Sequence, residues 1–350
     1  MTLKEIANEL NVSISTVSFV LNNKEGVSEK TRKVIASKLI ENGYIPSGVP
    51  KKDKSDKPKS IRFLKYAKHS QVVDGNVGFV SSIIDSAELE ARNQGYHLII
   101  TSFGDKEIDD VFSMVRSQPF SGVILLGTEF EEKDYHYLDS FPSPLIVVDN
   151  HFEFYPVDVV TMDNQDIVYM AIRHLYNLGH RNIGYLHSHI QIANFAERYR
   201  AFERGIKKMG LQFNSENMFS VNATMQGSYE SIAEMLEKGV SFPPAIFADN
   251  DSIAIGAIKA FKKFNYGIPE DISIVGFDDI PFCTMSEPQL TTMRVPTADI
   301  GKWTVQRLCQ RIADPEIPVM KMHFSAELIS RKSTKAVIIP DSQAKQNDNA

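Results

Sequence analysis

Two pairs of aspartates in the second half of the chain are the side chains most suited to chemistry. Asp249 and Asp251 are two residues apart, and Asp278 and Asp279 are adjacent. Paired carboxylates can bind a divalent metal ion or divide the acid and base roles of a catalytic site. The two pairs fall at the ends of separate predicted strands, and this separation argues against one shared metal or catalytic centre.

Other residue types that perform catalysis or bind metal ions are sparse. His187 and His189 are close in sequence, but two histidines in a predicted loop lack the remaining ligands of a zinc site. Cys283 and Cys309 have no metal-type spacing. The chain contains no P-loop, no GxSxG elbow and no dinucleotide-binding fingerprint. We therefore expect no catalytic residue, metal ion or cofactor, and an enzyme is the least favoured class of function.

The composition is that of a water-soluble globular protein. Hydrophobic residues make up 43% of the 350 positions and charged residues 23%, which is ordinary for such proteins. This length allows two or three domains with a sizeable core. The sequence has no apolar run of about 18 residues and no signal-peptide pattern at its start. Its cysteine usage fits a reducing cytoplasm, and we expect no association with a membrane.

The net charge of −6 is distributed unevenly along the chain. Residues 1–60 contain 11 Lys and Arg against 7 Asp and Glu, a net charge of +4, which leaves −10 for the other 290 residues. A basic N-terminal segment attracts DNA phosphates, and an acidic body is repelled by them. A charge excess alone is usually a solvated surface, so this pattern only supports a DNA-binding role.

Three short helices are predicted in residues 1–46. Apolar residues recur at helical spacing over Leu3–Leu10 and Ser15–Asn22, and a third helix starts at Ser28 and ends at Gly43. Two helices joined by a tight turn and braced by a third form a helix-turn-helix, whose second helix enters the DNA major groove. From this pattern alone, a three-helix cap without a DNA role is the alternative.

The helical periods separate packing residues from outward residues. In the second helix, the inward residues are Val17, Val20 and Leu21, and the outward residues are Ile14, Ser15, Ser18 and Phe19. In the third helix, the predicted packing residues are Val34, Ile35, Leu39 and Ile40.

The rest of the chain predicts an α/β core behind a linker. Residues 47–60 have no apolar periodicity and contain two prolines, which is typical of a linker. From residue 61, strands and helices alternate in two successive units, with Val159–Met162 entering the second. This alternation predicts two doubly wound lobes with parallel sheets. In such sheets, ligands bind outside the carboxyl ends of the strands.

The N-terminal helices resemble the headpiece of the lactose/galactose repressor (LacI/GalR) family. The matching residues are Thr2-Leu3-Lys4-Glu5-Ile6-Ala7, Val12-Ser13, Thr16-Val17-Ser18, Leu21-Asn22, Val27-Ser28, Thr31-Arg32 and Gly43-Tyr44-Ile45-Pro46. The resemblance continues in the core, at Gly179-His180-Arg181-Asn182-Ile183-Gly184-Tyr185, Glu197-Arg198-Tyr199-Arg200 and Val275-Gly276-Phe277-Asp278-Asp279. The dense matches keep their spacing, so the resemblance is specific.

The resemblance implies a bacterial transcription regulator, expected to repress carbohydrate-metabolism genes. Its expected partners are operator DNA, a sugar or sugar-phosphate effector and a second copy of the chain. A phosphocarrier protein as corepressor stays an open possibility. The expected DNA-contacting residues are Thr2, Ser13, Ile14, Ser15, Thr16, Ser18, Phe19, Asn22, Val27, Ser28 and Thr31.

The resemblance also implies a domain plan: an all-α helix-turn-helix headpiece and an α/β core of two periplasmic-binding-protein-like lobes. The expected segments are the headpiece 1–46, the linker 47–60, the core 61–340 and a polar tail 341–350. Lobe one comprises about 61–158 and 293–322, and lobe two about 159–290 and 324–340.

Five residues match effector-binding positions of the family. Arg198 corresponds to the arginine that binds effector hydroxyls, and Asp278 to an opposing carboxylate. Asn250 matches a further polar contact, Asp149 ends a lobe-one strand at the cleft, and Phe79 matches an aromatic residue at the start of the first core helix. A sugar needs charged partners for its hydroxyl groups and an apolar surface to stack on.

Three departures from the family pattern limit how far residue roles can be transferred from the family to this sequence. A short stretch between Lys65 and Asn76 is inserted at the expected cleft mouth, so relatives do not identify the sugar. Phe19 stands where the family usually has an arginine that contacts a base. Asp53 stands where relatives place the leucine of a hinge helix, and Pro50 disfavours that helix, so we expect residues 47–60 to stay extended.

The departure at Phe19 keeps a second function open. The alternative is a cytoplasmic sugar-binding protein with a vestigial headpiece and no operator-specific DNA binding. A gel shift with the promoter region of the protein's own gene separates the two functions.

Overall fold

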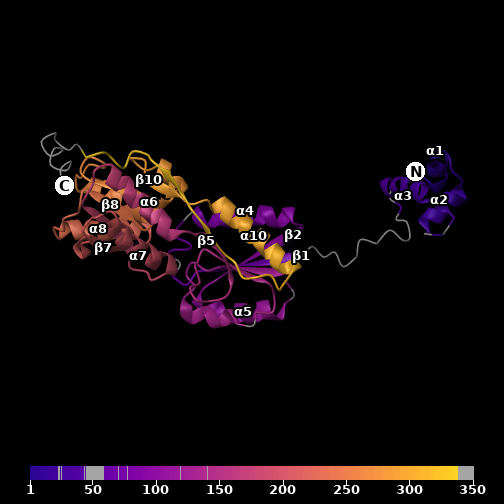
Figure 1. Ribbon diagram of the computed structural model, residues 1–350, viewed down its shortest axis with the longest axis horizontal. Helices are drawn as coiled ribbons and strands as arrows, with labels where there is room; N and C mark the ends of the chain where they lie inside the picture. Colours follow the sequence, from indigo (N-terminus) through magenta and orange to yellow (C-terminus); the bar gives the residue numbers. More distant parts are fainter. Residues whose placement is uncertain are drawn as a thin grey trace. The chain divides into compact units, whose positions relative to one another are not determined.

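The computed structural model divides the chain into two units, Met1–Lys59 and Ser60–Ala350. It describes residues 1–337 apart from 23, 25, 43, 45–58, 70, 77, 119 and 140. Figure 1 draws both units and labels many of their helices and strands. Most of the predicted linker, including Asp53, and the whole predicted tail 341–350 lie outside the described residues.

Hydrogen bonds from side chains start the helices of the first unit. The helices are α1 (Leu3–Glu9), α2 (Ile14–Leu21) and α3 (Glu29–Glu41). Thr2 and Glu5 form a capping box at α1, in which each side chain accepts a hydrogen bond from the other residue's backbone N–H. At α2, the Ser13 hydroxyl accepts a hydrogen bond of 3.0 Å from the Thr16 N–H.

A small apolar core holds these helices together. Its buried residues are Ile6, Ala7, Val17, Val20, Ile35 and Leu39, with Leu21 packed against them. The inward residues predicted for α2 are therefore confirmed. The prediction for Val34 is wrong, because its side chain is 53% exposed. Ile35 and Leu39 lie one helical turn apart and define the buried face of α3, which turns Val34 away from it.

Each lobe of the second unit contains one sheet. In the described residues, the lobe-one sheet has the order β11-β5-β4-β3-β1-β2, with β1 (Lys59–Tyr66), β2 (Tyr96–Phe103), β3 (Gly122–Leu126), β4 (Leu145–Val148), β5 (Asp158–Met162) and β11 (Lys321–Phe324). The lobe-two sheet has the order β12-β10-β9-β8-β6-β7, with β6 (Ile183–Ser188), β7 (Met218–Val221), β8 (Ala245–Ala248), β9 (Ser273–Asp278), β10 (Thr291–Arg294) and β12 (Glu327–Ile329).

Both sheets are built mainly from parallel pairs, as the alternation of strands and helices predicts. Strand β3 pairs in parallel with both β1 and β4, and β8 with both β6 and β9. Strand β10 pairs with β12 in the antiparallel direction. The strands β3, β5, β8 and β9 are buried along their whole length, which is expected for sheets covered on both faces.

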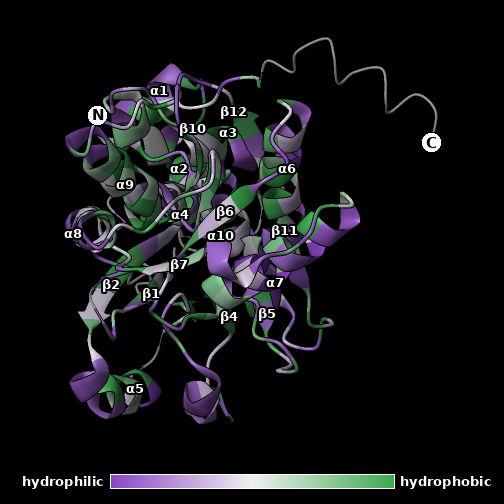
Figure 2. Cartoon of the chain, turned by 90° about the vertical axis from the view of Figure 1, so that its left-hand side faces the viewer, coloured by the Kyte–Doolittle hydropathy of each residue, from purple (hydrophilic) through white to green (hydrophobic). Residues whose placement is uncertain are grey.

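Amphipathic helices cover the sheets. Those of lobe one are α4 (Phe79–Asn93), α5 (Ile108–Ser117) and α10 (Thr297–Ala313), and those of lobe two are α6 (Asn164–Asn177), α7 (Ala193–Lys208), α8 (Met225–Glu237) and α9 (Asp251–Lys263). Short 3-10 helices are η1 (Asp105–Glu107), η2 (Glu132–Leu138), η3 (Ser215–Asn217) and η4 (Pro281–Thr284). Helices such as α5 and α8 carry hydrophilic residues outward, as Figure 2 shows. None of the described helices is long and apolar enough to cross a membrane.

The points at which the chain passes between lobes differ from the predicted ones. Strand β5 pairs with β4 and β11 of lobe one, so lobe one extends to Met162 instead of ending at residue 158. Strand β10 pairs with β9, so lobe two extends to Arg294 instead of residue 290. Alternation of strands and helices shows where a strand is, but its sheet is set by pairing partners that are distant in sequence. The last crossing follows β11, so lobe one extends to Phe324 instead of residue 322.

Candidate functional site

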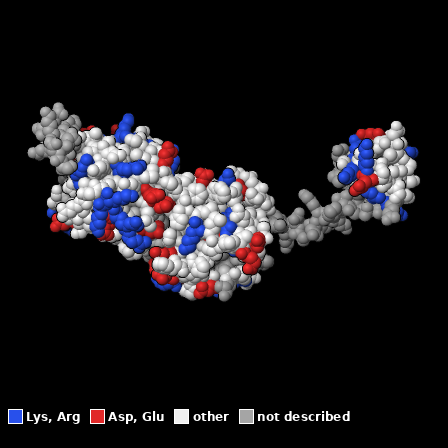
Figure 3. Space-filling view, viewed as in Figure 1, with Lys and Arg blue, Asp and Glu red and all other residues white. Residues whose placement is uncertain are grey.

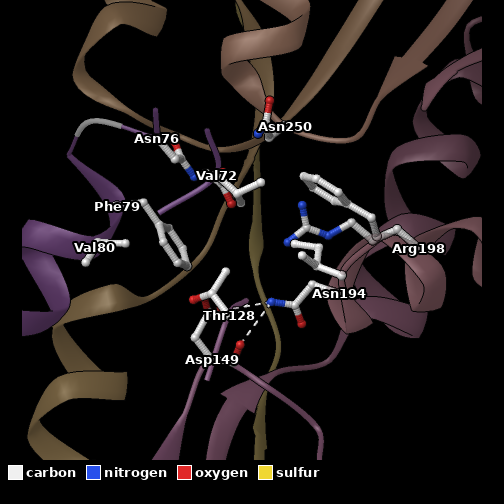
Figure 4. Close-up of a pocket in the computed structure, with 12 residues that line it drawn as sticks. Val72, Asn76, Phe79, Val80, Thr128, Asp149, Asn194, Arg198 and Asn250 are labelled. Carbon is white, nitrogen blue, oxygen red and sulfur yellow. Dashed lines mark hydrogen bonds between the residues drawn. The ribbon is translucent and has the colours of Figure 1, made fainter. Parts of the chain in front are cut away.

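A small pocket with a cavity volume of about 20 Å³ lies between the two lobes. Lobe one contributes Val72, Asn76, Phe79, Val80, Thr128 and Asp149, and lobe two contributes Ile192, Asn194, Phe195, Arg198, Asn250 and Asp278. Figure 4 shows these side chains converging on one space. The structure thus brings together all five residues that the sequence assigns to an effector site, and it adds seven others.

Arg198 on α7 is the charged centre of the lobe-two side. Its side chain is 3% exposed, and its guanidinium carbon lies 3.6 Å from the centroid of the Phe277 ring. Nε donates to Oδ1 of Asn164 at 2.9 Å, and Nη1 donates to the backbone oxygen of Asp249. These partners are neutral, and no acidic side chain in the described part of the chain forms a direct ion pair with the guanidinium. A buried cation in this state is prepared to bind polar groups of a ligand.

Asp149 follows β4 and forms part of the lobe-one side. Its backbone has a φ of 64°, in the left-handed region. Thr128 donates a hydrogen bond to its Oδ2, and Nδ2 of Asn194 donates to its Oδ1 at 3.0 Å and to its backbone oxygen at 3.1 Å. Burial raises the pKa of Asp149 to about 6, against the opposing effect of these donors and of Arg198. Asn194 lies on lobe two, so these two bonds cross the cleft.

Asp278 and Asn76 form the second polar contact across the cleft. Asp278 ends β9 of lobe two and is 5% exposed, and Asn76 precedes α4 of lobe one and is 8% exposed. Nδ2 of Asn76 donates to Oδ2 of Asp278 at 2.7 Å. Burial raises the pKa of Asp278 well above its ordinary range, although Arg198 opposes the change. Among the described residues, Oδ1 of Asn76 and Oδ1 of Asp278 have no hydrogen-bond partner, and such buried acceptors cost free energy until a donor reaches them.

Asn250 and the aromatic residues complete the pocket. Oδ1 of Asn250 caps α9 by accepting the N–H of Ile253 at 2.9 Å, which fixes the side chain and leaves Nδ2 to face a ligand. Phe79 and Phe195 are both buried and provide flat apolar surfaces. Val80 adds to the apolar wall of lobe one. The pocket therefore combines hydrogen-bonding groups of both kinds with apolar faces.

Some of the additional pocket residues carry a signal in the sequence. Asn194 lies one helical turn before Arg198, so a helical pattern places both on the same face. Thr128 follows β3 at the same edge of the sheet at which Asp149 follows β4. Val72 lies in the stretch inserted at the expected cleft mouth and Asn76 directly follows it, but the sequence does not indicate which of these side chains reach the pocket.

The predicted DNA-contacting residues of the first unit divide into exposed and structural groups. Ile14 is 47% exposed and Phe19 is 39% exposed, and Ser15 and Asn22 are also exposed. Ser18 and Thr16 are half-buried. Figure 3 shows basic side chains on the visible face of this unit. The outward face of α2 thus offers hydroxyl, amide and apolar groups, which are the groups that contact base edges and thymine methyls.

The remaining residues of that set mainly hold the helices in place. Thr2 and Ser13 cap α1 and α2. Ser28 accepts the N–H of Thr31 at 3.3 Å before α3, and their hydroxyls are 2.8 Å apart. Val27 packs against the apolar core. Residues that cap a helix can also present their hydroxyls to phosphates, because helix N-termini favour anions.

Comparison with known protein families identifies one domain in each unit. Residues 2–47 match the family model of bacterial regulatory proteins of the lacI family, and residues 172–334 match a periplasmic binding protein-like domain. The chain belongs to the lacI family. This lacI-family protein is therefore a DNA-binding transcriptional regulator with a periplasmic-binding-protein-like core, and the predicted family and fold class are confirmed.

Individual relatives align with the lacI-family chain over nearly its whole length. It is 27% identical over 339 residues to the HTH-type transcriptional repressor PurR of Mannheimia succiniciproducens, covering 96% of this chain and 99% of that protein. It is 28% identical over 342 residues to the protein of the same name from Haemophilus influenzae, with the same coverage.

Solved structures share the fold. A transcriptional regulator CelR–cellobiose complex superimposes with a TM-score of 0.71 at 21% identity, covering 95% of this chain and 99% of that one. A Lac repressor dimer bound to operator and the anti-inducer ONPF gives a TM-score of 0.71 at 22% identity, covering 96% and 99%.

Proposed function

We propose that the protein is a transcriptional repressor that binds a pseudo-palindromic operator as a homodimer and responds to a small polyhydroxylated ligand held between its lobes. The observation that carries this proposal is the convergence of Arg198, Asp149, Asp278 and Asn76 on one buried pocket, with two oxygen atoms unpaired. The relatives named as repressors, an operator-bound dimer and a cellobiose complex support it. Such a regulator acts in the cytoplasm, where the chromosome is.

The pocket suits an uncharged sugar better than a sugar phosphate. Each sugar hydroxyl both donates and accepts hydrogen bonds, and the pocket offers Arg198 and Asn250 as donors and Asn76 and Asp278 as acceptors. A phosphate would bring negative charge beside two buried carboxyl groups, Asp149 and Asp278, with only one arginine among the pocket residues to balance it. The apolar rings accommodate the non-polar face of a sugar.

A planar heterocycle bearing N–H donors is the second candidate ligand. Oδ1 of Asn76 and Oδ1 of Asp278 are unpaired acceptors on hydrogen-bonded neighbours. The ring of Phe79 lies in the same pocket and provides a surface on which a flat ring can stack. A ligand panel should therefore contain nucleobases beside sugars.

The ligand would act by changing how firmly the lobes hold together. Atoms that meet across the cleft, such as Asn194 with Asp149, separate when the lobes open. A ligand that contacts both lobes favours the closed arrangement by its difference in affinity for the two states. Coupling of 1–3 kcal/mol is typical and changes operator affinity about 5- to 150-fold.

The direct experiment measures binding to the promoter region of the protein's own gene by gel shift, with each compound of the panel added in turn. The proposal expects a retained, sequence-specific complex whose amount changes with at least one sugar or base. A protein that binds the ligand but retains the promoter no better than shuffled DNA would instead have the vestigial headpiece of the alternative function.

A further inference from the structure

Residues 71–76, here called the clasp, lie between β1 and α4; residues 71–75 belong to the stretch that is inserted relative to the family pattern, and Asn76 directly follows it. The clasp is anchored on lobe one by Glu129, whose side chain is 1% exposed. This carboxylate accepts hydrogen bonds from the backbone N–H groups of His69 at 2.6 Å, Val73 at 3.0 Å and Val72 at 3.3 Å. A buried carboxylate held by several backbone donors is a rigid anchor, so the clasp moves with lobe one.

The apolar side chain of the clasp is nevertheless packed in lobe two. Val72 is 5% exposed and belongs to a small buried cluster whose other members are Ile190, Ile192, Phe195 and Ala223. All four of these lie on lobe two, and Ile192 and Phe195 also line the ligand pocket. Val72 therefore seals the pocket by inserting into the opposite lobe.

Polar contacts join the two ends of the clasp to lobe two. Gln71 Oε1 accepts a hydrogen bond of 3.2 Å from Nδ2 of Asn222, and Asn76 donates its 2.7 Å bond to Asp278. Between them, a Cβ atom on Gly75 would lie 3.3 Å from the Thr224 side chain, so the clasp backbone itself runs close to lobe two.

We propose that the clasp is a size gate, which admits a ligand of one sugar ring or one nucleobase and excludes disaccharides and nucleosides. This inference rests on the proposed ligand site. With the lobes as they stand, the cavity among the pocket residues is about 20 Å³, close to the smallest volume that holds one water molecule, so a ligand enters only when the lobes part, and a larger ligand needs a wider opening. Val72 and Asn76 are themselves lining residues, so a longer ligand meets the clasp before the lobes can close.

The test is a thermal-shift panel on the full chain. The single-unit probes are hexoses, pentoses and free nucleobases, and the two-unit probes are cellobiose, lactose and the matching nucleosides. A bound ligand at about 100 times its Kd raises Tm by several degrees. We expect stabilisation of the wild type by a single-unit compound, with at least about 100-fold weaker affinity for the two-unit compound that contains it.

The variants Val72→Ala and Gln71→Ala open the clasp without touching its anchor. We expect each variant to reduce the difference in affinity between the single-unit and the two-unit compound to about tenfold or less. Asp74→Asn is the matched control: it lies in the same segment, but its ion pair with Lys65 stays within lobe one, so its selectivity should equal that of the wild type. Stabilisation of the wild type by a two-unit compound, or by no single-unit compound, would overturn the size gate, as would unchanged selectivity in both clasp variants.

Arg198→Ala separates failure of the gate from failure of the proposed function. If a two-unit compound raises the Tm of the wild type but not that of Arg198→Ala, the ligand binds at the proposed site and the size gate is wrong. If a response to any compound is unchanged in Arg198→Ala, the ligand binds elsewhere, and the proposed ligand site falls together with the gate.

Discussion

Asn76 of lobe one and Asp278 of lobe two meet across the cleft through a hydrogen bond of 2.7 Å, and each retains one unpaired oxygen. The same two side chains therefore link the lobes and offer acceptor oxygens to hydrogen-bond donors of a ligand. Binding and lobe closure are joined at this contact, because a ligand that reaches the two oxygens also bridges the lobes.

Arg198 should be the side chain on which ligand affinity depends most. Arg198→Ala removes a charged donor, and a hydrogen bond to a charged group contributes about 1.5–3 kcal/mol, so ligand affinity should fall about 10- to 100-fold. Arg204→Ala is the control, since Arg204 lies on the same helix and contacts Gln165 at the exposed surface. Calorimetry with a ligand from the panel measures both. Equal losses in the two variants would exclude a specific role for Arg198.

The sequence predicted the polar framework of this site but not its apolar closure. Arg198, Asp278 and Asn250 follow from the match to the family, and Asn194 could be added from the helical period. Val72 could not, because its place in the pocket depends on how Glu129, distant in sequence, holds an inserted loop. A loop without regular structure has no periodicity from which its packing can be inferred.

Stability should depend on pH through Asp149. Burial raises its folded-state pKa to about 6 from 3.8, so between these pH values the folded chain binds more protons than the unfolded chain. Stability from this group is therefore greatest at low pH and falls as pH rises through about 6. Asp149→Asn removes the dependence, so the stability of the variant relative to the wild type should rise from pH 4.5 to 7.5 by about 2 kcal/mol.

Denaturant unfolding of both proteins across that pH range tests this expectation. The test compares how steeply the free energy of unfolding changes with pH in the two proteins. A constant difference in stability is not informative, because the asparagine also changes the hydrogen bonds to Thr128 and Asn194. Asp74→Asn, which removes an exposed carboxylate, should follow the wild-type profile. Parallel profiles for Asp149→Asn and the wild type would contradict a raised pKa at Asp149.

The linker is predicted to leave the operator centre free of strong sequence preference. An apolar hinge wedge would unstack and kink the central base step, but Asp53 occupies that position in this sequence and Pro50 disfavours a helix. Half-site spacing should also be tolerant. Selection from a random DNA library, followed by a bend assay on the selected site, measures both properties. A fixed central CpG step with a sharp kink would show that a hinge forms despite this sequence.

In the headpiece, Phe19 and Ser13 should have separable effects. Phe19 is 39% exposed on α2, so Phe19→Ala should keep the fold but lower affinity for the selected site about tenfold or more, with little change for shuffled DNA. Ser13→Ala removes the α2 cap and should cost about 1 kcal/mol of headpiece stability. Hydrogen exchange of residues 3–21 and anisotropy with both DNAs separate these effects. The exposed Val34→Ala serves as control, and its affinity for both DNAs should match the wild type.

The boundaries of the fold show a second limit of sequence reasoning. The predicted alternation of strands and helices from residue 61 is confirmed, because short apolar runs between turn residues mark buried strands such as β3 and β8. The lobe to which β5 belongs was predicted wrongly. Its position is fixed by contacts such as the 2.9 Å bond from Arg307 to Asp158, which joins α10 to β5 over a long sequence separation. Pattern within a segment carries no information about that partner.

The central claim, that ligand binding in the cleft controls specific DNA binding, is tested most directly by fluorescence anisotropy with a labelled fragment of the protein's own promoter region. The wild type should bind this fragment more tightly than shuffled DNA, with affinity that falls steeply with salt. A sugar or nucleobase from the panel should change the affinity of the wild type about 5-fold or more and leave that of Arg198→Ala unchanged. Equal affinity for promoter and shuffled DNA, or a ligand response that survives in Arg198→Ala, would contradict the claim.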